Sequence, residues 1–283
     1  MTNIMNLLIC TDLDRTLIPN GKSPESPCAR ALFHQLVAHE NISLAYVTGR
    51  DQNLVKNAME NYNLPSPNFV ISDVGSSIYK IVNNQWLRIT DWDQKIQQDW
   101  GNFTREKLST FLIDIKECKL QEKEKQGLSK LSYYISLKYD HKKLLKKIKL
   151  RLEEVNIKSN LIWSVDEEKN IGLLDILPKS ANKYQAINYL MNKENFTLEN
   201  TVFAGDSGND LDVLVSPIKS ILVANAHEEI KNIIQKMQLE EAVNYIYIAQ
   251  GKYLNLNGNY SAGILEGIVY YFPNLIPLLT VKI

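Results

Sequence analysis

Two aspartates near the start of the chain are spaced so that both could act on one ligand. Asp12 and Asp14 follow the apolar run Leu7-Leu8-Ile9-Cys10, with one residue between them. In an extended segment the side-chain direction repeats every second residue, so both carboxylates start on one side of a strand tip. Carboxylate oxygens are the ligands that Mg²⁺ prefers, and a carboxylate can also act as a nucleophile. The alternative is that these residues only mark the exit of a strand into a loop.

Three further polar clusters follow predicted strands or begin predicted helices. They are Thr48-Gly49-Arg50, Lys183, and Gly205-Asp206-Ser207-Gly208-Asn209-Asp210. Ligands bind at the carboxyl ends of the strands in open α/β sheets, so all the clusters are expected at one edge. A nucleophile, a cation, hydroxyl and amide donors and an acidic metal site suit phosphoryl transfer. Taken singly, Lys183 could be a surface lysine, and Ser207 and Asn209 could be helix caps.

The elements that must position these clusters alternate between strand and helix. The apolar patterns predict strands at 7–10, 42–47, 69–71, 201–204 and 220–223, and helices at 29–39, 54–59, 183–191, 211–215 and 228–237. Strand and helix units of this length connect by right-handed crossovers. The sequence therefore predicts an α/β protein with a Rossmann-like parallel sheet as its core.

A segment of different composition interrupts this pattern. Residues 83–177 are rich in Trp, Lys and Glu, with charged helices predicted at 104–124 and 142–154 and strands at 131–139 and 161–165. We expect an inserted α/β domain at 83–177, between the two parts of the core at 1–82 and 178–283.

Charge and cysteine content argue against several classes of partner. Lys plus Arg and Asp plus Glu number 32 each, so bulk charge predicts neither nucleic-acid nor anionic-membrane binding. The lysines at 142–149 alternate with leucines, as on a solvated helix face. No segment approaches the roughly 18 consecutive apolar residues of a membrane span. Three cysteines without paired spacing fit a reducing cytoplasm. With no coiled-coil seam, we expect a monomer or weak dimer.

The four clusters resemble the signature motifs of the haloacid-dehalogenase-like (HAD) hydrolases. The insertion is similar in place and size to the C2-type α/β cap of subclass IIB. A closer similarity, to the sucrose-phosphate phosphatases, rests on several further segments: Leu44–Arg50, Asp73–Tyr79, Lys130–Tyr133, Asp175–Pro178, Asn182-Lys183 and Ser261–Glu266. Arg15 departs from the pattern, because Gly or Asn is usual there.

The resemblance implies a role for each motif residue. Asp12 would be the nucleophile and Asp14 the acid and base. Mg²⁺ would be held by Asp12, by Asp206, by the Asp14 carbonyl and by Asp210 through water. The phosphate-binding residues would be Thr48, Gly49, Lys183 and Asn209.

Sugar recognition is expected where the cap meets the core. Lys130, Ser132 and Tyr133 are candidates for contacts with sugar hydroxyls, although Tyr133 could equally be a packing residue. Arg50 could contact the sugar, or could only pair with Asp51 or Asp73.

The predicted function is Mg²⁺-dependent hydrolysis of a small-molecule sugar phosphate, sucrose 6-phosphate first among them. The alternatives are a phosphatase for another disaccharide or hexose phosphate, and a phosphosugar mutase. A phospho-receiver module is the non-enzymatic alternative, since it also joins Asp, Thr and Lys around Mg²⁺. Receivers are about half this length, however, and carry their acidic pair before the phosphorylated Asp.

Overall fold

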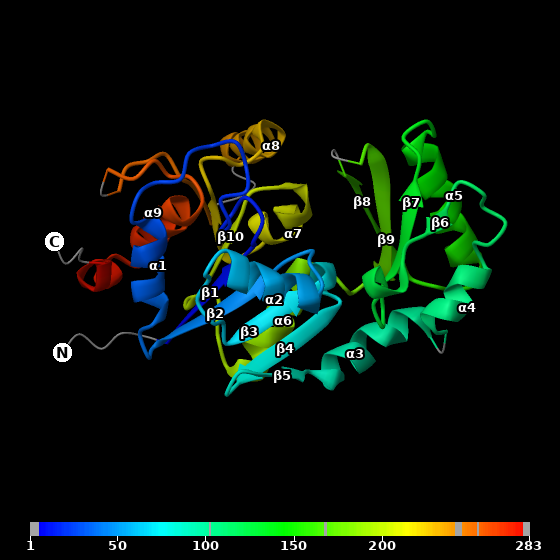
Figure 1. The fold of residues 1–283 in the computed structure, drawn as a ribbon, viewed down its shortest axis with the longest axis horizontal. Helices are drawn as coiled ribbons and strands as arrows, with labels where there is room; N and C mark the ends of the chain where they lie inside the picture. The colour runs from blue at the N-terminus through cyan, green and yellow to red at the C-terminus, as the bar shows by residue number, and fades with distance from the viewer. Residues whose placement is uncertain (1–5, 102, 167–168, 241–244, 254, 280–283) are drawn as a thin grey trace.

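A computed structural model describes residues 6–101, 103–166, 169–240, 245–253 and 255–279. Figure 1 shows a larger domain that holds both ends of the described chain and a smaller domain beside it. The smaller domain is formed by the middle of the sequence. We call the larger domain the core and the smaller one the cap.

The core is built on an eight-stranded sheet. Its strands run in the order β12 (Ile246–Ile248), β11 (Lys219–Leu222), β10 (Thr201–Gly205), β1 (Leu7–Thr11), β2 (Ile42–Val47), β3 (Phe69–Ser72), β4 (Ser77–Val82) and β5 (Gln85–Arg88). The first six strands are parallel to one another, and β4 and β5 pair antiparallel. The predicted α/β class and parallel core are confirmed. The strands that end in the polar clusters, β10, β1 and β2, are neighbours.

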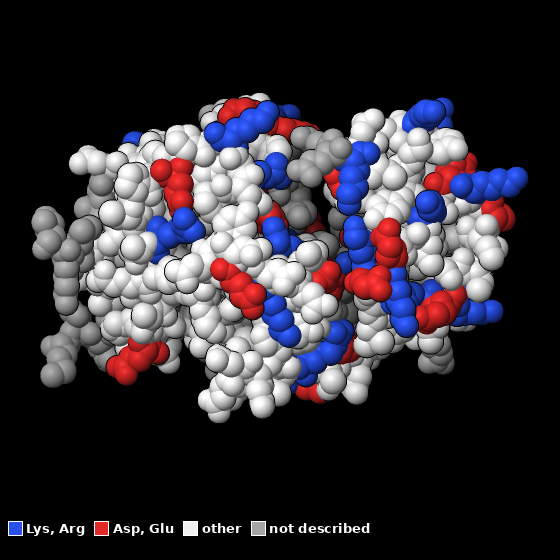
Figure 2. All heavy atoms as spheres, in the orientation of Figure 1, with Lys and Arg blue, Asp and Glu red and all other residues white. Residues whose placement is uncertain are grey.

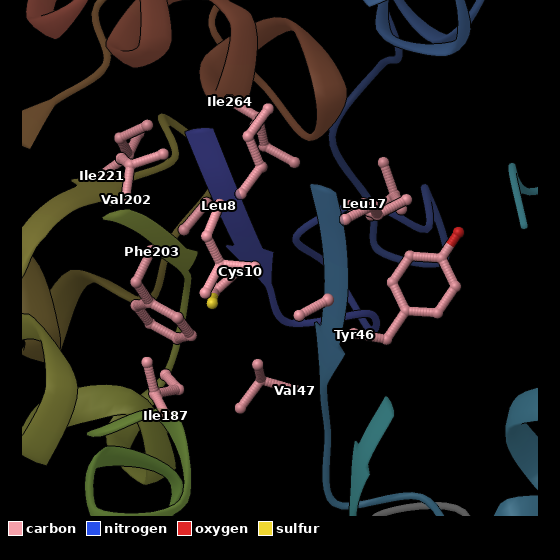
Figure 3. Close-up of a cluster of buried hydrophobic side chains, with 14 of the residues drawn as sticks. Leu8, Cys10, Leu17, Tyr46, Val47, Ile187, Val202, Phe203, Ile221 and Ile264 are labelled. Atoms are coloured by element: carbon pink, nitrogen blue, oxygen red, sulfur yellow. The ribbon is translucent and has the colours of Figure 1, made fainter. Parts of the chain in front are cut away.

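Helices cover both faces of the sheet. They are α1 (Ala29–Val37), α2 (Gln52–Asn61), α6 (Lys183–Glu194), α7 (Leu211–Leu214), α8 (Glu228–Leu239) and α9 (Ser261–Tyr271). All five residues of β1 are buried, as expected of a strand covered on both sides. Figure 3 shows Ile264 of α9 and Ile187 of α6 on opposite sides of β1. The central strand, and with it the position of Asp12, is therefore fixed by packing from both faces.

The boundary between core and cap differs from the predicted one at 82/83. The Asn83-Asn84 turn, with φ of 50° and 63°, joins β4 to β5 as a hairpin of the core sheet. Helix α3 (Thr90–Gln97) then packs Trp92 and Ile96 into the core. The hairpin turn explains the difference, because strand pairing holds the segment after residue 83 on the sheet.

The cap is a four-stranded antiparallel sheet covered by helices. Its strands run in the order β6 (Lys119–Leu120), β7 (Leu131–Ile135), β9 (Ile171–Pro178) and β8 (Ser159–Asp166). Helix α5 (His141–Glu154) turns Leu144, Ile148 and Leu152 inward, close to the prediction at 142–154. The chain passes from the hydrophobic cluster of the cap to that of the core between Ile176 and Leu177.

The predicted helix at 104–124 is wrong. Helix α4 ends after Arg105–Thr110, and turns lead from it to β6. The hydroxyls of Ser109 and Thr110 donate to the carbonyls of Glu106 and Lys107 at 2.7 Å each. Such side-chain bonds compete with the helical backbone pattern.

In the part of the chain that the structure describes, no helix is long and apolar enough to cross a membrane.

Candidate active site

Asp12 lies where three neighbouring strands end. It follows β1, and its backbone N–H donates to the Ala204 carbonyl of β10 at 2.9 Å. Its side chain is only 6% exposed. The Nζ atom of Lys183 lies 3.1 Å from Asp12 Oδ1 and 2.6 Å from Asp210 Oδ1. Asn182 caps α6 by accepting from the Gln185 N–H, which places Lys183 in the first turn of that helix.

Asp12, Asp206 and Asp210 form an acidic triad, with one oxygen from each within 4.8 Å of the others. Asp210 Oδ2 accepts the backbone N–H groups of Asp206 and Ser207 at 3.1 Å each. A Cβ at Gly205 would lie 2.7 Å from the Asp210 carboxyl carbon, so only glycine leaves room for this carboxylate. Ser207 begins the helical turn with a capping box.

The triad has the properties of a metal site. Asp206 Oδ2 is buried and accepts no hydrogen bond from any residue that the structure describes. Burial, together with the charge of Asp210, raises the pKa of Asp206 to about 7. Burial also raises the pKa of Asp12, with Lys183 opposing the shift. A bound divalent cation would remove this repulsion and keep the carboxylates ionised, so the residues fit Mg²⁺.

Asp14 lies outside the triad and is held by a separate set of donors. Arg50 donates to both of its oxygens, from Nε at 2.7 Å and from the terminal nitrogen at 2.6 Å. Asn20 Nδ2 donates at 2.6 Å. Burial opposes the charge of Asp14, but these bonds and the Arg50 charge outweigh it and lower its pKa. Asp51 instead caps α2 through the Leu54 N–H at 2.9 Å.

The Thr48-Gly49-Arg50 loop lies at the end of β2, beside this pair. Thr48 is buried, whereas Gly49 is exposed. Backbone hydrogen bonds from the turn after β3 hold the loop in place. The Asp73 N–H donates to the Arg50 carbonyl at 2.9 Å, and the Val74 N–H donates to the Thr48 carbonyl at 3.1 Å. Asn209 is exposed and accepts a bond from Ser207 Oγ at 2.9 Å.

Arg15 has a left-handed backbone, with φ of 56°. This conformation favours glycine and asparagine, which accounts for the residue types usual at this position. Its N–H donates to Asn20 Oδ1 at 2.8 Å, and its carbonyl accepts from Asn225 Nδ2 at 2.6 Å. Arg15 Nε lies 3.4 Å from Asp206 Oδ2. The sequence prediction missed Asn20 and Asn225, because they lie outside the motifs: Asn20 bonds the Asp14 carboxylate and the Arg15 N–H, and Asn225 bonds the Arg15 carbonyl.

The three cap candidates differ in their surroundings. Lys130 Nζ pairs with Asp73 Oδ1 of the core at 2.5 Å. Ser132 Oγ donates to Asp175 Oδ1 at 2.5 Å. Tyr133 is buried in the hydrophobic cluster of the cap, which is a packing position. Figure 2 shows acidic and basic side chains gathered where the two domains meet.

Comparisons with known proteins agree with this site and fold. The family model for sucrose-6F-phosphate phosphohydrolase matches residues 5–272. A protein of Nitrosococcus oceani named as a HAD-like hydrolase is 47% identical over 94% of this chain and 72% of its own length. Sucrose-phosphatase 2 of Nicotiana tabacum is 30% identical over 81% of this chain and 53% of its own length, so the chain spans about half of that relative.

Solved structures show the same fold. The sucrose-phosphatase of Synechocystis sp. PCC6803, solved with sucrose and phosphate, has a TM-score of 0.73 at 22% identity and covers 95% of this chain and 98% of its own. The HAD subclass IIB sugar phosphatase BT4131 has a TM-score of 0.55 at 15% identity, over 96% of this chain and 99% of its own. The chain belongs to the sucrose-6F-phosphate phosphohydrolase family of HAD phosphatases.

Proposed function

We propose that this protein hydrolyses sucrose 6-phosphate to sucrose and phosphate, with Mg²⁺ as its cofactor. The observation that carries the proposal is the placement of Asp12 beside Lys183 and within the acidic triad, with Asp14 held close by on the same loop. These groups are what a phosphoryl transfer through an aspartyl-phosphate requires. The family match supports the sugar phosphate as substrate.

The reaction would proceed in two displacements at phosphorus. A carboxylate oxygen of Asp12 attacks, the bond from phosphorus to the sugar oxygen breaks, and Asp14 gives its proton to that oxygen. Water then attacks the aspartyl-phosphate, Asp14 takes the proton of the water, and the bond to Asp12 breaks. Arg50 holds Asp14 as the anion that the second step needs. The first step requires Asp14 to take up a proton once the sugar phosphate is bound.

The remaining core residues would hold the phosphate. We assign this role to the Thr48 hydroxyl, the Gly49 N–H, the Lys183 ammonium and the Asn209 amide. Asp12, Asp206 and Asp210, with the Asp14 carbonyl, would hold Mg²⁺. When bound, the ion supplies positive charge that offsets the charge of the phosphoryl oxygens.

Contacts with the sugar would come from both sides of the domain boundary. Arg50 on the core carries N–H donors that suit hydroxyl groups, and Ser132 on the cap, whose proton is donated to Asp175, offers its oxygen as an acceptor. Lys130 lies at the same boundary and is held by Asp73. The buried position of Tyr133 favours packing as its role.

All three cysteines are free thiols, which supports a cytoplasmic protein.

The test is a phosphate-release assay across a panel of substrates with Mg²⁺ present or chelated. We expect the highest kcat/KM with sucrose 6-phosphate, lower values with other phosphorylated disaccharides and hexose phosphates, and loss of activity on chelation. Turnover of hexose monophosphates alone would overturn the sucrose assignment. Formation of an isomeric sugar phosphate without free phosphate would indicate the mutase instead.

A further inference from the structure

The turn of residues 73–75, here called the Asp73 turn, has an unusual backbone. Asp73, Val74 and Gly75 all have positive φ, at 52°, 59° and 101°. For a β-branched residue such as Val74 this is a strained conformation, which costs about 1–3 kcal/mol and persists only where the surroundings impose it. Such strain gathers at functional sites, so the contacts of this turn are informative.

The turn contacts both elements that we assign to phosphate binding. On one side its first two N–H groups bond the carbonyls of Arg50 and Thr48. On the other side Gly75 packs so closely on α6 that an added Cβ would overlap the Asn182 backbone and lie 2.9 Å from the Lys183 nitrogen. A shift of the turn would therefore move the Thr48 loop and the start of α6 together.

The cap reaches this turn through one ion pair. Lys130, just before β7, is 6% exposed, and its partner Asp73 is also 6% exposed. Their charged atoms lie 2.5 Å apart. Within the core, helix α3 also holds this turn, because Trp92 Nε1 donates to the Gly75 carbonyl at 2.9 Å. The cap therefore contacts the strained turn through Lys130. The turn in its place supports the backbone of the residues that we assign to phosphate binding.

We propose that the Asp73 turn couples the seating of the cap to the phosphate site, with Lys130 and Asp73 as positioning residues. In this role Lys130 acts through Asp73 and not by contact with the sugar. Breaking the pair lets the strained turn relax, and the backbone that supports Thr48 and Lys183 moves with it. The consequence is weaker phosphate binding even when no sugar is present.

The test measures the dissociation constant of inorganic phosphate by calorimetry with the Mg²⁺-loaded enzyme. The variants are Lys130→Met, Asp73→Asn and the double variant. Lys80→Met is the matched control, because Lys80 pairs with Glu194 at 2.7 Å outside the site. We expect each single variant to raise the dissociation constant about tenfold, the double variant to raise it no further, and the control to leave it unchanged. Non-additivity of this kind identifies two residues that act as a pair.

Other roles for Lys130 predict different results. If its charge acted on phosphate through space, Lys130→Met would weaken binding and Asp73→Asn would tighten it. If Lys130 only bound the sugar, neither variant would change phosphate binding. Either result overturns the proposal. Because wild-type hydrolysis of sucrose 6-phosphate is measured separately, these results leave the proposed function standing.

A further variant keeps the test valid if the charge variants fail to fold. Val74→Gly removes the backbone strain without touching the ion pair. The variant also removes the buried Val74 side chain, which offsets the relief of strain in the thermal midpoint, so the decisive readout is phosphate binding, which we expect to be weaker. A Val74→Gly protein that binds phosphate as the wild type does would contradict a role for the strained turn.

Discussion

Lys183 occupies the centre of the acidic cluster. Its ammonium lies within 3.1 Å of Asp12 and 2.6 Å of Asp210 and is fully buried. Burial opposes its charge, but the two carboxylates outweigh burial and raise its pKa. Lys183 is therefore a fixed cation in the site, which suits the binding of a phosphate and the partial neutralisation of the nucleophile.

The strongest effect on catalysis is expected for Asp12→Asn. An amide cannot attack phosphorus, so phosphate release should fall by about three orders of magnitude or more. The fold should persist, because the substitution removes a carboxylate from a cluster whose charges repel one another. Phosphate release and a thermal melt measure the two effects. The matched control is Asp212→Asn, because Asp212 is an exposed residue of α7; this variant should retain activity. Full activity of Asp12→Asn would refute the mechanism.

Arg15→Asn should change Mg²⁺ affinity and stability together. The variant removes a guanidinium nitrogen that lies 3.4 Å from Asp206 Oδ2, so the Mg²⁺ concentration for half-maximal activity should fall several-fold. Asparagine also tolerates the left-handed backbone better, so the thermal midpoint should not fall. Arg30→Asn, which breaks a pair with Glu25 at 2.6 Å, is the control. An unchanged or higher Mg²⁺ requirement for Arg15→Asn would count against this role.

The Arg50–Asp14 pair predicts a pH dependence of stability. The pKa of Asp14 is lowered in the folded protein, so the pair stabilises the fold above the unfolded pKa of about 3.9 and loses this effect as pH falls through the folded pKa. Because Asp14 is 37% exposed, the effect is at most about 1 kcal/mol. Urea unfolding of wild type and Arg50→Met should differ more at pH 6 than at pH 3. An equal difference at both pH values would exclude this linkage.

At the scale of elements, α9 anchors a loop that supports the active site. Glu266 of α9 is buried and accepts from Tyr247 OH at 2.8 Å, Gln250 N at 2.9 Å and Gly251 N at 2.8 Å. The same loop ends at Tyr260, whose N–H donates to Asn225 at 2.8 Å. Asn225 in turn bonds the Arg15 carbonyl. Glu266 thus holds the segment at 247–251, and Tyr260, just before α9, is linked to the backbone of Arg15 through Asn225.

Glu266→Ala should therefore lower stability. It leaves two backbone N–H groups and a hydroxyl without their acceptor, so the free energy of unfolding should fall by about 2–4 kcal/mol. Glu228→Ala is the surface control, because Glu228 is 79% exposed and pairs with Lys231 on the same helix; it should cost about 0.5 kcal/mol or less. Urea titration measures both. Similar losses for the two variants would show that the Glu266 bonds contribute little.

The elements that could be predicted from the sequence are those whose local pattern of apolar residues is strong. The buried strands and the amphipathic helix α5 were predicted because their apolar runs and helical spacing require burial. The helix predicted at 104–124 failed because hydroxyl bonds at Ser109 and Thr110 end it. The β4–β5 hairpin was not predicted, because it lacks a continuous apolar run. The Asn83-Asn84 turn is the feature of the sequence that could have indicated it.

At the scale of the whole molecule, the site residues come from distant parts of the chain. The motif residues could be predicted because each follows a strand or begins a helix, and the parallel sheet brings those ends together. The pairing of Lys130 with Asp73 could not, because it joins the cap to the core. The pairing of Arg50 with Asp14 could not either, because it depends on the exact course of the loops that follow the neighbouring strands β2 and β1.

The most direct measurement of the central claim is a rapid acid quench of the enzyme with sucrose 6-phosphate within the first turnover, followed by mass spectrometry of the peptide that contains Asp12. We predict one phosphoryl group on this peptide at early times, none in Asp12→Asn, and much less with glucose 6-phosphate. Release of phosphate from sucrose 6-phosphate while this peptide stays unmodified throughout the first turnover would contradict the account.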